Sequence, residues 1–182
     1  MNKIVAVGID IGGTNTVYGF IDEAGTVLEY EEISTRGDQP IENLVDRLDS
    51  RIKLFFNNNS NLNLKGIGIG APNGNHYNGK IQTPPNLSWG DVHIVSIFEE
   101  KFNCNTILTN DANAAALGEK KFGVAKNMND FVLITLGTGL GSGIFSGGNL
   151  LYGHDGFAGE MGHVSIDANG RKCNCGSRGC LE

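Results

Sequence analysis

The sequence predicts an α/β fold, in which strands and helices alternate along the chain. Short apolar segments bounded by glycine and asparagine turns are typical of strands, and segments with the apolar period of a helix follow them. A strand that runs into a Gly-Thr turn occurs once in each half, in DIGGTNT (10–16) and in TLGTGLGSG (135–143). With 182 residues the chain can bury a sizeable core, in one domain or one and a half.

The N-terminal segment predicts three strands and a helix. Gly12-Gly13 and the Glu-Ala-Gly at 23–25 supply the turns between the strands. In the helix, apolar residues recur at i, i+3, i+4 and i+7 from Ile41 to Phe55, and Asp38 is a possible cap. The predicted strands are 3–10, 16–22 and 26–33, and the predicted helix is 40–56.

The rest of the chain continues this alternation. The Asn-rich segment 57–63 predicts a loop, and the segment 72–90, rich in Asn, Gly and Pro, predicts a longer one. We expect strands at 66–71, 104–109, 130–136 and 141–147, and helices at 93–102 and 111–122.

The two Gly-Thr turns suggest two related units of the βββαβα kind. We expect a first domain over residues 1–109 and the start of a second over 110–182. No low-complexity linker separates the two halves, and the second unit is expected to be incomplete.

Composition excludes several function classes. A formal net charge of -6 gives no electrostatic footprint for nucleic acid. No segment approaches the roughly 18 apolar residues of a membrane span. The first apolar run contains Asp10 and lacks the small-residue cleavage site of a signal peptide. We therefore expect a cytoplasmic protein that binds neither nucleic acid nor membranes.

The cysteines are crowded near the C-terminal end. Cys173, Cys175 and Cys180 form a C-x-C-x4-C cluster, and this crowding favours a metal over a disulfide framework. His163, ten residues upstream, supplies the fourth N or S ligand of a closed tetrahedral zinc site. A reactive or redox cluster is the alternative. Cys104 stands alone and is expected to be a small core residue.

The first Gly-Thr turn has the residues of a phosphate site. Glycine N–H groups and Thr14 can cradle phosphate oxygens, and Asp10 can hold Mg²⁺ directly or through water. An ordinary hairpin turn with a strand-end Asp is the alternative. The second turn is followed by another predicted strand, which disfavours a Rossmann dinucleotide site.

Asn110 and Asp111 stand where a strand meets a helix. They could simply cap the helix, because Asn and Asp are favoured there. Alternatively, Asp111 takes a proton from a hydroxyl that attacks a phosphoryl group, while Asn110 binds a neighbouring hydroxyl. Glu160 and Glu182 bracket the cysteine cluster, and surface salt bridges are the simpler reading of both.

In their order, these motifs resemble the ROK family (repressors, open reading frames and sugar kinases). DIGGTNT resembles its first phosphate loop, LTNDANAAALGE (108–119) the segment with its catalytic Asp, and residues 136–163 its signature. The cysteine cluster resembles the family's zinc site. The resemblance covers the whole chain and implies the actin-like sugar kinase (ribonuclease H-like) ATPase fold, as a first domain and a truncated second one.

The resemblance also implies roles for individual residues. Asp111 would be the general base for the 6-hydroxyl of a sugar, and Asp10 would help place Mg²⁺. The other sugar hydroxyls would be bound by Asn110, Glu160, His163 and Glu182. The nucleotide phosphates would face Gly12, Gly13, Thr14, Gly137, Thr138 and Gly139. A structural zinc, held by His163, Cys173, Cys175 and Cys180, would fix the loop with the sugar contacts. The loop 71–89 would add Asn73 or Gly74.

The implied function is an ATP-dependent hexose 6-kinase with D-glucose as the expected substrate; N-acetylhexosamines and fructose are the alternatives. ATP, Mg²⁺ and structural Zn²⁺ are the implied cofactors, and a homodimer is expected because dimers are common among relatives. Family kinases continue into an adenosine-binding segment, so the chain is expected to match an N-terminal portion.

Two other classes are less favoured. A sugar-sensing repressor of the family carries a helix-turn-helix ahead of the first strand, which here starts at Lys3. A filament-forming or chaperone relative of the same fold would have the phosphate turns but neither the cysteine cluster nor the Glu–His pair.

Overall fold

A computed structural model describes residues 3–84, 87–137 and 139–182. The chain divides into two compact units, Met1–Asn110 and Asp111–Glu182, and each is described by itself. Within the described residues, no helix combines the length and the apolar character that crossing a membrane requires.

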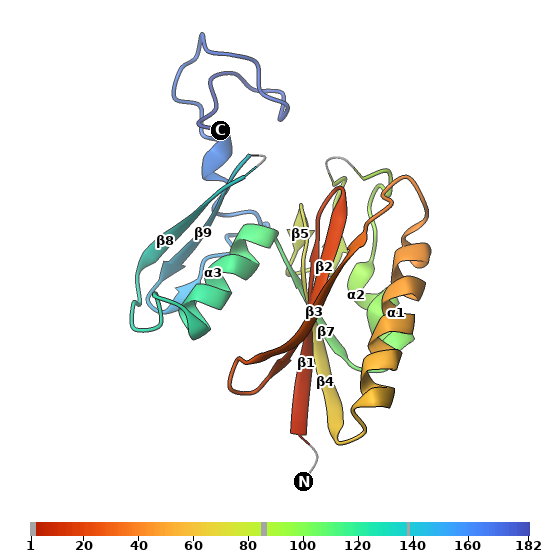
Figure 1. The fold of residues 1–182 in the computed structure, drawn as a ribbon. Helices are drawn as coiled ribbons and strands as arrows, with labels where there is room; N and C mark the ends of the chain where they lie inside the picture. The colour runs from red at the N-terminus through yellow and green to blue at the C-terminus, as the bar shows by residue number, and fades with distance from the viewer. Residues whose placement is uncertain (1–2, 85–86, 138) are drawn as a thin grey trace. The chain divides into compact units, whose positions relative to one another are not determined.

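Unit 1 contains a five-stranded sheet with the order β3-β2-β1-β4-β7 (Figure 1). The pairs β1–β2 and β2–β3 are antiparallel, whereas the pairs β1–β4 and β4–β7 are parallel. The strands are β1 (Lys3–Ile11), β2 (Asn15–Asp22), β3 (Val27–Ser34), β4 (Leu62–Gly70) and β7 (Asn105–Thr109).

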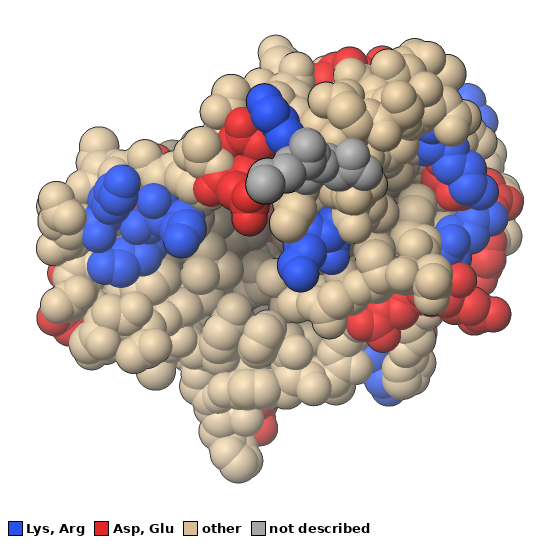
Figure 2. All heavy atoms as spheres, turned by 90° about the horizontal axis from the view of Figure 1, so that it is seen from below, with Lys and Arg blue, Asp and Glu red and all other residues tan. Residues whose placement is uncertain are grey.

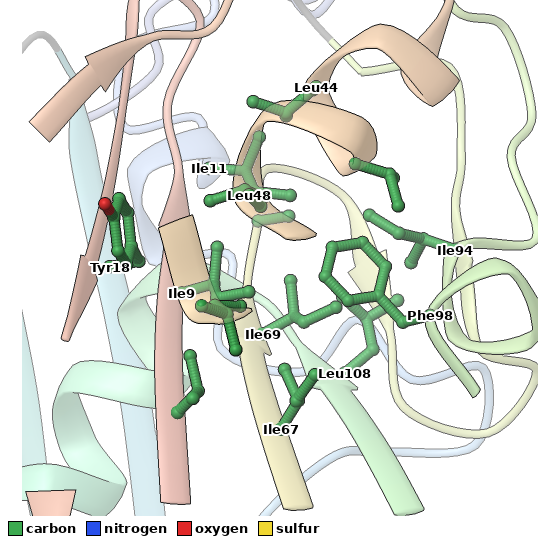
Figure 3. Packing of buried hydrophobic residues seen from close by; sticks show 14 of the residues in the cluster. Ile9, Ile11, Tyr18, Leu44, Leu48, Ile67, Ile69, Ile94, Phe98 and Leu108 are labelled. Carbon is green, nitrogen blue, oxygen red and sulfur yellow. The ribbon is translucent and has the colours of Figure 1, made fainter. Parts of the chain in front are cut away.

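Two helices, α1 (Ile41–Asn58) and α2 (Ile94–Phe102), cover one face of this sheet (Figure 1). Alternate residues of β1, from Val5 to Ile11, are buried on that face, as the period of two in a strand requires. Leu48 of α1 lies over β1, and Phe98 of α2 lies among Ile69 and Leu108 (Figure 3). The helices thus enclose the apolar core of unit 1.

The carboxyl ends of the three parallel strands meet at one edge of the sheet. Asp10 pairs in register with Gly70, and Gly70 pairs with Thr109. The segments that follow β1, β4 and β7 therefore begin side by side. Ligands of open α/β sheets bind outside the carboxyl ends of the strands.

A small hairpin follows β4 at this edge. Its strands are β5 (Gly74–Asn75) and β6 (Lys80–Ile81). The Ala71 N–H donates to the Thr109 carbonyl at 3.1 Å, and a Cβ on Gly74 would lie 2.5 Å from the same oxygen. Glycine is therefore needed at 74 for this close approach.

Unit 2 contains a three-stranded antiparallel sheet with the order β10-β9-β8 and one helix, α3. A Cβ on Gly143 of β9 would lie 2.6 Å from the Ala116 Cβ of α3, so glycine lets this helix rest directly on the strand. The elements are α3 (Asp111–Phe122), β8 (Phe131–Leu136), β9 (Leu140–Ser146), β10 (Asn149–Leu150) and a 3-10 turn at Met161–His163.

The boundaries differ from the predicted ones at three places. Pro40 occupies the N-cap of α1 and no side chain caps the helix, so the expected cap at Asp38 is wrong. The helix continues to Asn58, and β4 begins at Leu62, inside the segment predicted as a loop. The hairpin β5–β6 lies within the predicted loop 72–90.

The face drawn in Figure 2 carries both basic and acidic side chains, in places directly beside one another and elsewhere with neutral residues between them. Interspersed charges of this kind are typical of a solvent-exposed surface.

The core of unit 1 leads to a prediction about stability. Leu48 is fully buried in α1, whereas Leu54 of the same helix is 53% exposed. We expect Leu48→Ala to lower the free energy of unfolding by about 2–5 kcal/mol because it leaves a cavity. Leu54→Ala, the matched control, should change it by less than about 0.5 kcal/mol. Urea unfolding of both variants measures the difference, and equal losses would contradict the packing.

Candidate functional site

The first glycine turn, residues 11–15, connects β1 to β2 in unit 1. The Gly12 N–H donates to the Asn15 carbonyl at 2.9 Å. A Cβ on Gly12 would lie 2.8 Å from that oxygen, so the turn closes only with glycine there. Thr14 is exposed at the tip, and its carbonyl accepts from the Thr35 N–H at 2.7 Å.

Asp10 precedes this turn as the penultimate residue of β1. It is exposed and lies at the edge where the parallel strands end. The structure thus brings together, within unit 1, the predicted magnesium residue and the predicted phosphate turn.

Asn110 follows β7 at the same edge and is half-buried. Asn73 lies in the loop fastened to Thr109, in a left-handed conformation with φ of 53°. Its Nδ2 donates to the carbonyls of Gln82 and Thr83 at 3.0 and 3.2 Å. The amide nitrogen of Asn73 therefore holds the loop together.

Asp111 begins α3 in unit 2 and is exposed. Its Oδ1 accepts the Ala112 N–H at 2.8 Å, which orients the carboxylate at the positive end of the helix. An exposed carboxylate with a fixed orientation can accept a proton from a bound hydroxyl.

Glu160 lies in an acidic neighbourhood within unit 2. Although Glu160 is exposed, partial loss of hydration raises its pKa, and the charges of Asp111 and Glu182 raise the pKa further. The charge of His163 opposes this by lowering the pKa. Asp111, His163 and Glu182 therefore all lie within electrostatic reach of Glu160.

Ser142 of β9 holds the backbone on both sides of Glu160. Its hydroxyl donates to the Gly159 carbonyl and accepts the Met161 N–H at 3.3 Å. Gly159 itself has a φ of 94°, a conformation that L side chains rarely adopt. The position of Glu160 is thus set by its neighbours in the chain.

The cysteine cluster is assembled as the sequence suggested. The ligand atoms of His163, Cys173, Cys175 and Cys180 all lie within 4.8 Å of one another. The Cys173 Sγ is 3.7 Å from His163 Nδ1, and the Sγ atoms of Cys175 and Cys180 are 3.7 Å apart. With Zn–S bonds of about 2.3 Å, ligands at the corners of a tetrahedron are about 3.8 Å apart. The four residues fit a zinc ion.

The thiols differ in their tendency to ionise. Loss of hydration, together with hydrogen bonds to Cys173 and Cys175, raises the pKa of Cys180 to about 11. A backbone hydrogen bond from Ser177 lowers the pKa of Cys175. Because zinc binds thiolates, its binding to this cluster must release protons.

Glu182 lies against both the cluster and the second glycine turn. Its Oε1 is 3.5 Å from the Cys173 Sγ and 3.7 Å from His163 Nδ1. Its Oε2 accepts the Leu140 N–H at 3.4 Å. The structure therefore brings Glu182 next to His163, as the resemblance implies.

The second glycine turn follows β8. The Gly137 N–H donates to the Gly139 carbonyl at 3.0 Å, and predicted Thr138 lies outside the described residues. Gly137 and Gly139 line a cavity of about 470 Å³ together with Arg171, Cys173 and Glu182.

Sequence reasoning missed two residues that position these segments, Ser142 and Thr35. Both are buried polar side chains, 4% and 1% exposed. The sequence marks Ser142 only as a residue that interrupts a glycine run. Nothing in the sequence marks Thr35, because its hydrogen-bond partners lie 21 and 23 positions earlier in the chain.

Comparisons with known proteins agree with this arrangement. The family model described as the ROK family matches residues 6–182. A glucokinase of Halalkalibacterium halodurans is 41% identical over 97% of the chain and 54% of its own length. A xylose repressor of Bacillus spizizenii is 40% identical over 97% of the chain and 46% of its own length.

Solved structures give the same result. A ROK family glucokinase from Streptomyces griseus, in complex with glucose and AMPPNP, has a TM-score of 0.82 at 34% identity, over 97% of this chain and 55% of its own. A ROK hexokinase from Thermus thermophilus also has a TM-score of 0.82, at 32% identity, over 98% of this chain and 59% of its own. The chain thus spans about half the length of these relatives.

These matches confirm the predicted actin-like sugar kinase fold, present as the N-terminal portion of such a protein. The match to the family model extends over nearly the whole chain, including both glycine turns and the cysteine cluster. The chain belongs to the ROK family.

Proposed function

We propose that the protein is an ATP-dependent sugar kinase that phosphorylates the 6-hydroxyl of a hexose, with D-glucose as the first candidate. The observation that carries this proposal is the group formed by Asp111, Glu160, His163 and Glu182 in unit 2. Carboxylates and an imidazole gathered in this way suit a polyhydroxylated ligand. The relatives named glucokinase support the same substrate class.

Asp111 is the general base in this proposal. Its side chain is exposed, as a base must be to reach the hydroxyl that it deprotonates, and it stands at the start of α3. The proton moves from the sugar hydroxyl to the carboxylate as the oxygen attacks the γ-phosphorus and ADP leaves. Asn110, Glu160, His163 and Glu182 then hydrogen-bond the other hydroxyls and hold the sugar in place.

The glycine turns supply the phosphate contacts. In the turn at 11–15, which closes only with glycine at position 12, the backbone N–H groups after Gly12 would bind phosphate oxygens. Gly13, Thr14, Gly137, Thr138 and Gly139 are assigned to the same task. Asp10 is the residue that would hold Mg²⁺, whose charge would offset that of the phosphates.

Zinc has a structural role in this proposal. All four positions would be filled by His163, Cys173, Cys175 and Cys180, which leaves no open position for water. Because Nδ1 of His163 faces the cluster, Nε2 is the nitrogen left for a sugar hydroxyl. The metal would thereby fix the segment between Glu160 and Glu182.

A second function, a sugar-responsive regulator, is favoured by the similarity to the xylose repressor. A regulator of this kind would bind the sugar without transferring phosphate. Among kinases, N-acetylhexosamines and fructose are the alternative substrates. A coupled ADP assay of the complete protein with a panel of hexoses separates these possibilities.

The base assignment predicts the effect of Asp111→Asn. We expect kcat to fall by roughly 10² to 10⁴, the usual contribution of a general base, while sugar affinity stays within a few-fold. The coupled ADP assay measures kcat, and calorimetry measures sugar binding.

Glu42→Gln is the matched control, because Glu42 is likewise an acidic residue in the first turn of a helix. It removes the same helix-dipole interaction without touching the site. Normal turnover in Asp111→Asn would contradict the base assignment.

The position of Glu160 depends on Gly159. A Cβ on Gly159 would lie 2.9 Å from the Ser142 carbonyl, and the φ of 94° would be strained. We expect Gly159→Ala to raise the sugar KM roughly ten- to a hundred-fold because it displaces Glu160.

Gly118→Ala in α3 is the control, since a Cβ there meets no atom within 4 Å. It should leave the sugar KM unchanged and stabilise the helix by about 0.5–1 kcal/mol. An unchanged sugar KM in Gly159→Ala would speak against a contact between Glu160 and sugar.

The zinc assignment predicts about one zinc ion per chain in purified protein. Cys180→Ser should lose the metal and part of the folding stability, whereas Cys104→Ser, which alters the cysteine packed against the core of unit 1, should keep it. Elemental analysis by mass spectrometry measures the content. Zinc-free wild-type protein would refute the assignment.

A further inference from the structure

We propose that Thr35 is a positioning residue for nucleotide binding, which clamps the glycine turn at 11–15 from the end of β3. The inference rests on the proposed function, because it takes this turn as the phosphate site. Thr35 lies more than 20 residues in sequence after the turn residues that it contacts, so the contact is visible only in the folded structure.

Thr35 contacts the turn through two different groups. Its backbone N–H donates to the Thr14 carbonyl at 2.7 Å, and its hydroxyl donates to the Gly12 carbonyl at 2.7 Å. The two acceptors lie on either side of Gly13. Both carbonyls are therefore turned toward Thr35.

A second hydroxyl completes the clamp. The Oγ1 atoms of Thr16 and Thr35 are 2.9 Å apart, and these residues are 0% and 1% exposed. A hydroxyl has one proton, and that of Thr35 is given to Gly12. Thr16 must then donate to Thr35, so a directed chain runs from Thr16 through Thr35 to the turn.

Arg47 of α1 anchors the other side of Thr35. Its guanidinium donates to the Ser34 carbonyl at 2.6 Å and to the Thr35 carbonyl at 3.0 Å. The clamp therefore joins the turn to α1, which packs on the core of unit 1. The turn is thereby connected to a helix that is packed on the core.

This connection has a consequence for phosphate binding. A peptide group is planar, so a carbonyl fixed on one side of the turn also fixes the direction of the adjoining N–H. With the carbonyls of Gly12 and Thr14 held, the N–H groups of Gly13 and Asn15 are oriented before a ligand arrives. Donors held in place beforehand bind with less loss of conformational entropy.

The test compares Thr35→Val with Thr35→Ser in the complete protein. Valine keeps the shape but removes the hydroxyl, leaving the Gly12 carbonyl and the Thr16 hydroxyl without partners. We expect Thr35→Val to raise the KM and the Kd for MgATP about ten-fold and to leave the sugar KM unchanged. Thr35→Ser, which retains the hydroxyl, should restore nucleotide affinity to within two-fold.

Thr106→Val is the matched control. Thr106 of β7 is also a buried threonine of unit 1, 4% exposed, but its hydroxyl lies near the Cys104 carbonyl, away from the turn. It should leave the KM for MgATP unchanged. Thr16→Val should have a smaller effect than Thr35→Val, because it removes only the outer link of the chain.

Three results would overturn the inference: an unchanged MgATP affinity in Thr35→Val, a parallel rise of both KM values, or failure of serine to restore affinity. Calorimetric titration with MgATP separates this inference from the proposed function. If wild-type protein binds MgATP but phosphorylates no hexose, the kinase proposal fails while the Kd values still decide the role of Thr35. If wild-type protein binds no MgATP, the clamp proposal is also wrong.

Discussion

The pairing of β1 on both of its sides is the constraint on which the rest of unit 1 depends. Because β1 is antiparallel to β2 and parallel to β4, its carboxyl end meets a tight turn on one side and the end of β4 on the other. One row of the sheet therefore contains Asp10, Gly70 and Thr109, and the polar segments after them start at one edge. The candidate phosphate and magnesium residues lie at this edge because the chain leaves the sheet there, at the carboxyl ends of the strands.

Unit 2 repeats the antiparallel half of this plan and uses glycine for a different purpose. Its order β10-β9-β8 matches β3-β2-β1, with a glycine turn after the first strand in both. Gly143 is needed where α3 packs on β9, so the glycine run 137–143 serves helix packing as well as the turn. The sequence alone does not show which glycines of this run are needed for the turn and which for close packing of the helix.

The fold could be predicted from the sequence wherever periodicity was strong. The buried alternation in β1 and the apolar stripe of α1 both appear at the predicted positions. The start of β4 was missed because LNLK lies in an Asn-rich segment, and β5–β6 because a two-residue strand depends on tertiary contacts. In the site, the His163 and cysteine cluster was readable from spacing. Ser142 and Thr35 were not, since their partners lie 17 to 23 residues away.

The parallel pairing of β1 also governs the order in which unit 1 can assemble. Lys3 pairs with Leu62, whereas the β1–β2–β3 meander and the contacts of Thr35 with the glycine turn involve only the first 35 residues. Contacts between residues close in sequence lose less loop-closure entropy and form faster. During synthesis, the turn and its contacts with Thr35 are thus expected to form while β4 is still being made. We expect the slow step of folding to be the pairing of β4 with β1, which by then is already paired with β2 on its other side.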